Sequence, residues 1–228
     1  MASPQNRLMN LPEAGSMTPR RPLGGHEFGP IRSHVRDYSR GVFKPPPPYR
    51  QTGIQPSVCK GDRLQLPRGQ FIEHLINNYY ETIHSIMPIL HWPQFSNAWD
   101  DAKVKGDLSE VTPAWASVLF AVLALGVVYS TDLEVRRLYP DQGKGFIVQS
   151  QGFLDLFNDD FSMDHARGAL LTSIYLTEVN CKSAAWTWLG STVRIAQDIG
   201  LHRQSGPWPV VEGEMRRRVW WGIYAWDR

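Results

Sequence analysis

Cysteine is scarce in this chain of 228 residues, and its scarcity excludes two classes of protein. The two cysteines, Cys59 and Cys181, are 122 positions apart. A disulfide framework needs several cysteines, and a structural zinc site needs cysteine or histidine ligands at close spacing. The sequence therefore predicts neither a disulfide-stabilised scaffold nor a cysteine-based metal site, and a reducing compartment is the simpler interpretation.

Long hydrophobic runs are also missing. The longest apolar stretch, 114–129, is shorter than the roughly 18–20 residues that span a bilayer. The first fifteen residues contain no apolar core of the kind found in secretory signals. We therefore expect no membrane contact.

Motifs that carry catalytic chemistry are missing as well. The chain has no Gly-x-Ser-x-Gly elbow, no phosphate-binding glycine loop and no nucleophile with a base nearby. Glu81 and His84 have the Glu-x-x-His spacing of di-iron bundles, but such a site needs a second copy and two further glutamates. We predict no catalytic residues and no metal ligands, and we do not expect an enzyme.

Proline and positive charge are concentrated at the N-terminal end. Residues 1–68 hold 11 of the 17 prolines and 11 Lys and Arg against 4 Asp and Glu, whereas the remainder has 13 against 18. Such a segment buries too little apolar surface to offset its ordering entropy. We expect 1–66 to be a disordered, basic, Pro-rich leader and 67–228 to be the folded domain.

Two features of this leader have functional interpretations. Residues 46–49 (Pro-Pro-Pro-Tyr) fit a polyproline ligand, although a stiff spacer is the more common meaning of so short a pattern. The arginines of the leader are scattered, so a solvated tail is favoured over a nucleic-acid or nuclear-import site.

Helical spacing of apolar residues dominates the folded part, and no strand-like alternation is present. Thr112 and Pro113 are typical of a helix start, and the helix that follows is apolar on every side, which predicts a central position. Four other helices are predicted. The first has a face that ends at Pro88 and consists of Phe71, Leu75, Tyr79, Ile83 and Ile86. The second is short, is opened by Trp92 and has Trp99 and Ala102 inward; the third covers 143–156, and the fourth is capped by Asp164. The class is all-α, with stacked helices.

The last forty-five residues predict two helices joined by a Pro/Gly loop. The first, 184–200, has an apolar stripe of Ala185, Leu189, Val193, Ala196 and Ile199. It ends at Gly200, where a left-handed C-terminal cap favours glycine and Leu201 can fold back onto the last turn. The second, 212–228, carries three tryptophans and a tyrosine, so we expect it to pack between several elements. Its predicted buried stripe consists of Met215, Val219, Gly222, Ile223 and Trp226.

These two helices resemble the middle regulatory domain of fungal binuclear zinc-cluster transcription factors, which shows an Ala-Trp…Leu-Gly-Leu-His-Arg helix followed by an Arg-rich helix ending in Asp-Arg. The segments 74–95 and 120–130 also resemble that domain, with Ser85 where a proline is usual. The residues that match the signature are Trp186, Gly190, Arg194, Gly200, Leu201, His202, Arg203, Glu214, Arg217, Arg218, Trp221, Tyr224, Asp227 and Arg228.

The resemblance implies a nuclear regulator of transcription whose DNA binding depends on a cluster of two zinc ions held by six cysteines. Cys59 and Cys181 cannot form that cluster, so zinc binding and DNA binding are implied for the family and are not carried by residues of this chain. No DNA-binding residue is identified, because Arg216, Arg217 and Arg218 point about 100° apart on a helix. Glu214 is expected to pair with Arg218 at i,i+4, and the arginines are expected to tie helices together. His91 and His202 are expected to be half-buried, hydrogen-bonded rings at helix ends.

Two alternatives follow from the resemblance. The chain is either part of such a factor, with further helices beyond Arg228, or an interaction module without DNA binding that forms homo- or heterodimers with related factors. A small-molecule effector of the domain is not identified by the sequence. In the first case the stack is truncated at its C-terminus, and we expect Trp220, Trp221 and Trp226 to be exposed and the isolated product to be marginally stable.

Overall fold

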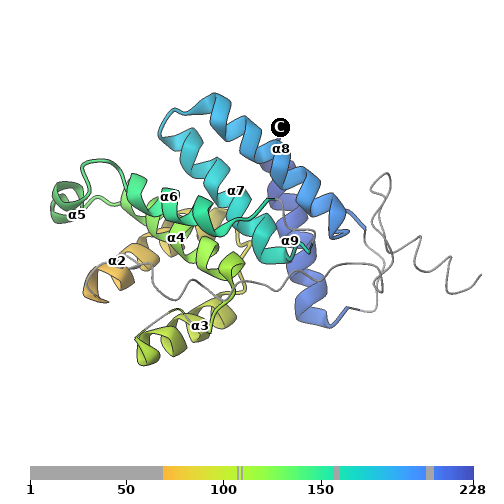
Figure 1. Ribbon diagram of the computed structural model, residues 1–228, viewed down its shortest axis with the longest axis horizontal. Coiled ribbons are helices and arrows are strands. Elements are labelled where there is room, and N and C mark those ends of the chain that lie inside the picture. Colours follow the sequence, from red (N-terminus) through yellow and green to blue (C-terminus); the bar gives the residue numbers. More distant parts are fainter. Residues whose placement is uncertain (1–68, 107, 109, 157–159, 204–207) are drawn as a thin grey trace, which may run out of the picture. The chain divides into compact units, whose positions relative to one another are not determined.

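The computed structural model describes residues 69–106, 108, 110–156, 160–203 and 208–228, and none of these forms a strand (Figure 1). The predicted all-α class is confirmed. The expected leader, 1–66, lies outside the described residues, as do Cys59 and the 46–49 pattern, and the domain boundary near residue 67 stays a prediction. The helices are α2 Gly69–Tyr79, the π-helical η2 Tyr80–His84, α3 Trp92–Lys105, α4 Pro113–Val128, α5 Leu133–Leu138, α6 Lys144–Phe153, α7 Met163–Glu178, α8 Lys182–Asp198 and α9 Val210–Trp226.

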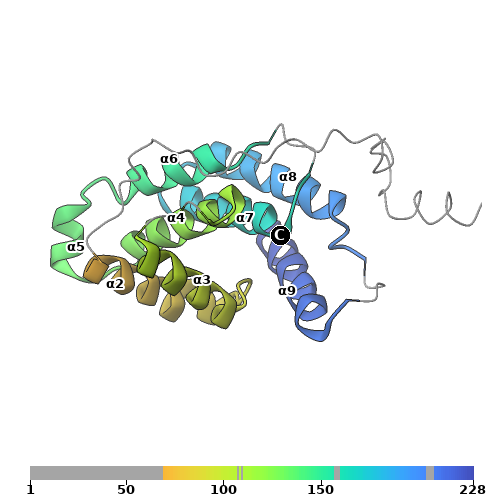
Figure 2. The same ribbon diagram turned by 60° about the horizontal axis from the view of Figure 1, so that its bottom comes forward.

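Helix α4 is the centre of the core, as its uniformly apolar sequence predicts. The Thr112 hydroxyl accepts a hydrogen bond from the Trp115 amide at 3.2 Å, and Pro113 occupies the first turn, where a missing N–H costs nothing. Every residue of 116–127 is buried. Helices α2, α6 and α7 pack against α4, which lies between α6 and α2 (Figure 2).

The contact between α2 and α4 depends on Gly126. A Cβ atom added at this position would overlap the backbone carbonyl oxygen of Leu75, so only glycine permits the two backbones to approach this closely. The Asn78 side-chain amide donates a hydrogen bond to the Gly126 carbonyl at 3.3 Å across the same contact.

The first predicted helix continues past α2 as a π-helical segment. Its wider hydrogen-bond spacing rotates the helix face, because residues three and four apart no longer lie above one another. The expected face therefore holds for Leu75 and Tyr79, which are fully buried, but fails at Ile86, which is 83% exposed. The next helix begins as expected, with the His91 ring accepting a hydrogen bond from the Gln94 amide at 3.3 Å. Its predicted inward residues, Trp99 and Ala102, are buried.

Helices α7 and α8 form an antiparallel pair that runs side by side (Figure 1). The prediction that Asp164 caps α7 is wrong by two residues, because Ser162 is the N-cap and its amide donates to the His165 ring at 3.0 Å. Asp164 instead lies in the first turn and pairs with Arg167 at 2.7 Å. Arg167 also donates to the Ile89 carbonyl at 2.8 Å, which fixes the segment before α3 onto α7.

Candidate functional site at the corner of α8 and α9

The C-terminal end of α8 confirms the predicted glycine cap. Gly200 has φ +73°, its amide donates to Gln197 at 3.1 Å, and the Leu201 amide donates to Ala196 at 2.9 Å. This pair of bonds satisfies the last carbonyls of the helix and turns the chain toward α9. Leu201 is 3% exposed, so the apolar contact expected of it is present.

The buried face of α8 is rotated from the predicted stripe. Ala185, Leu189 and Ala196 are buried as expected, whereas Val193 and Ile199 are half-buried. Thr192 and Ile195 are buried instead. A buried threonine is tolerated because its hydroxyl donates to the Trp188 carbonyl at 2.8 Å within the helix.

Helix α9 starts at Val210, two residues before the expected start at Glu212. The buried stripe is confirmed for Met215, Val219, Gly222 and Ile223. Trp226 is half-buried, and its indole N–H donates to the Ser173 hydroxyl of α7 at 3.3 Å.

The expectation that α9 packs between several elements fails on its other side, whereas the expectation that Trp221 is exposed is met. Trp221 is 54% and Tyr224 is 40% exposed, so these rings are not enclosed by other described elements. The guanidinium of Arg228 lies 4.6 Å from the Tyr224 ring centroid, and Trp220 is half-buried.

Arg216 joins the two helices, as expected for one of the three consecutive arginines. Its Nη2 donates to the Ile199 carbonyl at 2.6 Å, next to the glycine cap. Its guanidinium carbon lies 3.9 Å from the Trp208 ring centroid, and the side chain is 12% exposed. Burial lowers the pKa of Arg216 from its usual value, and Glu212, 3.8 Å away, acts in the opposite direction. Arg216 is absent from the predicted signature residues, although its i,i+4 spacing from Glu212 is a signal for it.

Arg217 and Arg218 instead pair within α9. Each lies 2.8 Å from a carboxylate oxygen of Glu214, which confirms the predicted Glu214–Arg218 pair. Hydrogen bonds from Arg218 and Arg217 lower the pKa of Glu214. These side chains are about half exposed, so the pairs stabilise the helix by only a few tenths of a kcal/mol.

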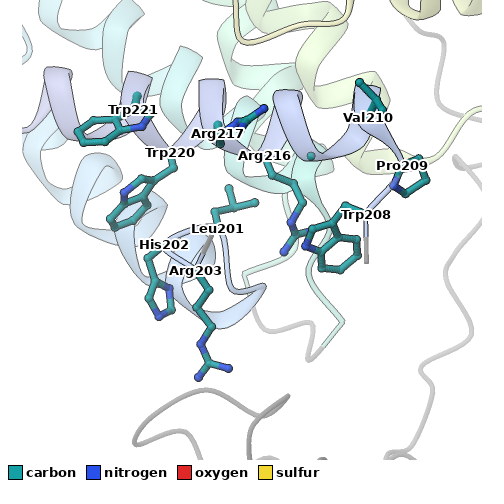
Figure 3. Close-up of a pocket in the computed structure, with 11 residues that line it drawn as sticks. Leu201, His202, Arg203, Trp208, Pro209, Val210, Arg216, Arg217, Trp220 and Trp221 are labelled. Carbon is teal, nitrogen blue, oxygen red and sulfur yellow. The ribbon is translucent and has the colours of Figure 1, made fainter. Parts of the chain in front are cut away.

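A pocket of about 300 Å³ lies between the turn after α8 and the first half of α9 (Figure 3). The signature residues that it brings together are Leu201, His202, Arg203, Arg217 and Trp221. The His202 ring is 5.9 Å from the Trp220 ring, which also lines the pocket.

The signature residues of α8 itself lie away from this pocket. Trp186 is 77% exposed, Gly190 is exposed, and Arg194 is an exposed residue whose guanidinium donates to Gln197 at 3.1 Å. The residues that match the family signature therefore do not form one site. Some of them line the pocket, and others lie on the solvent-exposed face of α8.

The described residues contain no group of three or more His, Cys, Asp or Glu side chains close enough to hold a metal ion. His84, of the Glu-x-x-His spacing, is packed among aromatic rings, with centroids at 5.2 Å from Tyr80 and 5.1 Å from Trp92. Burial, and secondarily the charge of Arg218, lowers the pKa of His84, so the ring is neutral at pH 7. Across the described ranges, no helix is both long and apolar enough to cross a membrane.

The profile of the fungal specific transcription factor domain matches residues 76–228, and the chain belongs to this family. Residues 74–95, which carry part of the sequence resemblance, overlap the start of that match.

Several curated relatives are similar over the same region. An uncharacterized transcriptional regulatory protein of Schizosaccharomyces pombe is 27% identical over 172 residues, covering 74% of this chain and 22% of the relative. A transcriptional regulator of Aspergillus novofumigatus is 25% identical, with 71% and 24% covered, and the lactose regulatory protein of Kluyveromyces lactis is 25% identical, with 74% and 18% covered. The chain thus spans about a fifth of the length of these relatives. No solved structure shows a significant match.

Two signature glycines of α8 give a matched pair of substitutions with opposite expected effects. Gly190 has open space at its Cβ position, so Gly190→Ala is expected to stabilise the domain by about 0.5–1 kcal/mol through helix propensity. Gly200→Ala also meets no clash, but φ +73° is unfavourable for alanine, and a loss of about 1 kcal/mol is expected. Urea unfolding followed by circular dichroism measures both. Changes of the same sign would contradict the α8 cap described above.

Proposed function

We propose that this chain is the regulatory-domain region of a fungal transcription regulator that acts in the nucleus. The observation that carries the proposal is the family match over 76–228. The names of the relatives, which include transcriptional regulators of two fungi and a lactose regulatory protein of a third, support it. The pocket at the corner of α8 and α9 and the exposed tryptophans of these helices suit a domain that binds a small molecule or a protein partner.

DNA contact and zinc binding are proposed to lie outside this chain. The family resemblance implies a zinc cluster built from closely spaced cysteines, and Cys59 and Cys181 do not have that spacing. The arginines of α9 also support the proposal that DNA contact lies elsewhere, because Arg216 binds the end of α8, and Arg217 and Arg218 pair with Glu214. The domain would then restrain or activate a DNA-bound factor in response to an effector or a protein partner.

A second candidate function is a protein-interaction module that pairs with a second copy or with related factors. The exposed tryptophans favour it, since Trp186 is 77% and Trp221 is 54% exposed. Tryptophan is enriched at the centres of protein interfaces. Analytical ultracentrifugation of the 228-residue chain distinguishes the two, because a stable dimer supports the module and a monomer at micromolar concentration counts against self-association.

A tethering experiment tests the main proposal. The chain is fused to an unrelated DNA-binding domain and placed upstream of a reporter in a fungal host. We expect transcription to rise or fall at least threefold relative to the DNA-binding domain alone, and a fluorescent fusion to accumulate in the nucleus. Reporter output equal to that of the DNA-binding domain alone would argue against a role in transcription.

A further inference from the structure

The pocket at the corner of α8 and α9 has a one-sided charge. Eleven residues line it, and the charged ones among them are three arginines, of which Arg217 pairs with Glu214 and Arg216 lies 3.8 Å from Glu212. The first turn of α9 also contributes Val210 and Gly213 to the lining. Pro209, the N-cap residue, forms no side-chain cap, and Glu212 in the first turn lies at the positive end of the helix dipole of α9.

Arg216 supplies a partly buried cation to the pocket. One of its nitrogens, Nη2, is used by the Ile199 carbonyl, whereas its Nε is buried and has no hydrogen-bond partner among the described residues. A buried N–H group without a hydrogen-bond partner destabilises the fold. When the group is charged, as in a guanidinium, its hydrogen bond to an anion is strongest where little water competes. The Glu212 carboxylate lies 3.8 Å from Nη1 of Arg216, which is too long for a hydrogen bond, so Nε still has no hydrogen-bond partner among the described residues.

The rest of the wall is aromatic. Trp208 stacks on the Arg216 guanidinium at 3.9 Å, and Trp220 lies on the other side of Arg216, next to His202 (Figure 3). Trp221 completes the set of three indoles that line the pocket. Indole surfaces favour flat apolar groups, which stack on them at ring distances of a few ångströms.

The volume limits the size of the occupant. About 300 Å³ is at the lower end for small-molecule sites and holds on the order of ten water-sized groups. This is the size of a single aromatic ring with one acidic substituent. The arginines repel a cation. An aliphatic anion would not stack on the indole rings of the pocket.

We propose that this pocket binds a small organic anion in which a carboxylate is attached to a flat aromatic ring. The carboxylate lies against Arg216, and the ring lies against the indole of Trp220, because the Arg216 guanidinium already covers one face of Trp208. The proposal depends on the pocket alone, so it can fail while the role in transcription holds, and the reverse is also true.

Isothermal titration of the full 228-residue chain with benzoate and indole-3-carboxylate tests the proposal, with tryptophan fluorescence as a second readout. We expect saturable 1:1 binding of at least one of these acids. Benzamide, which keeps the ring but not the charge, and acetate, which keeps the charge but not the ring, are each expected to bind at least tenfold more weakly. Equal binding of benzamide overturns the proposal, and so does binding of an acidic aromatic peptide without binding of the free acids.

Variants locate the site. Arg216→Gln is expected to weaken benzoate binding at least tenfold, whereas Arg194→Gln, which removes an exposed guanidinium outside the pocket, leaves it unchanged. Gly213→Leu keeps Arg216 and fills the pocket from α9, where an added Cβ meets only the Trp208 Cβ at an ordinary 3.5 Å. The Gly213→Leu variant therefore tests the site even if the Arg216→Gln variant is unfolded, as shown by loss of its helical circular dichroism. Unchanged binding in Gly213→Leu, or in folded Arg216→Gln, overturns the assignment.

Discussion

Gly126→Ala is expected to be among the most damaging single substitutions in the domain, with a loss of at least ~3 kcal/mol of unfolding free energy. The added methyl group would overlap the Leu75 carbonyl oxygen, which belongs to the backbone of α2 and cannot rotate away. Either α2 moves off α4 or the helices bend, and both expose part of the core. Alanine also improves helix propensity by up to about 1 kcal/mol, so a small effect would mean that the helices do not touch here.

Thermal and urea unfolding of the purified chain measure this loss. Gly152→Ala in α6 is the matched control, because it has open space at its Cβ position and makes the same chemical change in a helix. We expect Gly152→Ala to be neutral or slightly stabilising. Equal stability of the two variants would refute the close packing of α2 on α4.

Phe120→Ala is expected to cost about 3–5 kcal/mol. Phe120 is fully buried at the middle of α4, and its ring lies 5.6 Å from Phe153 and 6.5 Å from Phe146 of α6. Its removal loses the transfer free energy of the ring and leaves a cavity that three packed helices cannot close. A domain with typical stability of 5–15 kcal/mol would lose a large part of it.

The same denaturation measurements test this second loss. Val148→Ala is the control on α6, since Val148 is 55% exposed and its truncation is expected to change stability by no more than about 0.5 kcal/mol. A Phe120→Ala variant as stable as Val148→Ala would show that α4 is not the centre of the core.

The sequence predicts the features of this fold that depend on local pattern. The apolar α4 and its Thr112 cap, the glycine cap at Gly200 and the buried stripe of α9 all follow from spacing and residue type, and the structure has each of them. These signals work because neighbouring turns of a helix determine them.

Features that depend on contacts between distant segments could not be predicted in this way. Nothing near Gly126 in the sequence indicates that Leu75 approaches it, and the π-helical turn that exposes Ile86 has no clear residue signal. The Asp164 prediction failed because serine and aspartate are both good N-caps, and Ser162 forms a capping box with His165.

The candidate site was only partly predictable for the same reason. Similarity to a family singled out Leu201, His202 and Arg203, which do line the pocket, but also Trp186, which lies on the open face of α8. It missed Arg216 and Trp208, whose importance comes from their stacking across the corner. Family signatures include residues that shape the fold as well as residues that contact a ligand, and only the three-dimensional arrangement separates the two groups.

We propose that the folded helical domain of this chain regulates transcription. The most direct test of this role is the tethered reporter carrying wild-type, Gly152→Ala and Gly126→Ala chains at equal protein levels, with DNA binding supplied by the fused domain. We expect the wild-type and Gly152→Ala chains to change reporter transcription to the same extent, and the Gly126→Ala chain to give the same output as the fused DNA-binding domain alone. Reporter output that is the same for all three chains would contradict this proposal.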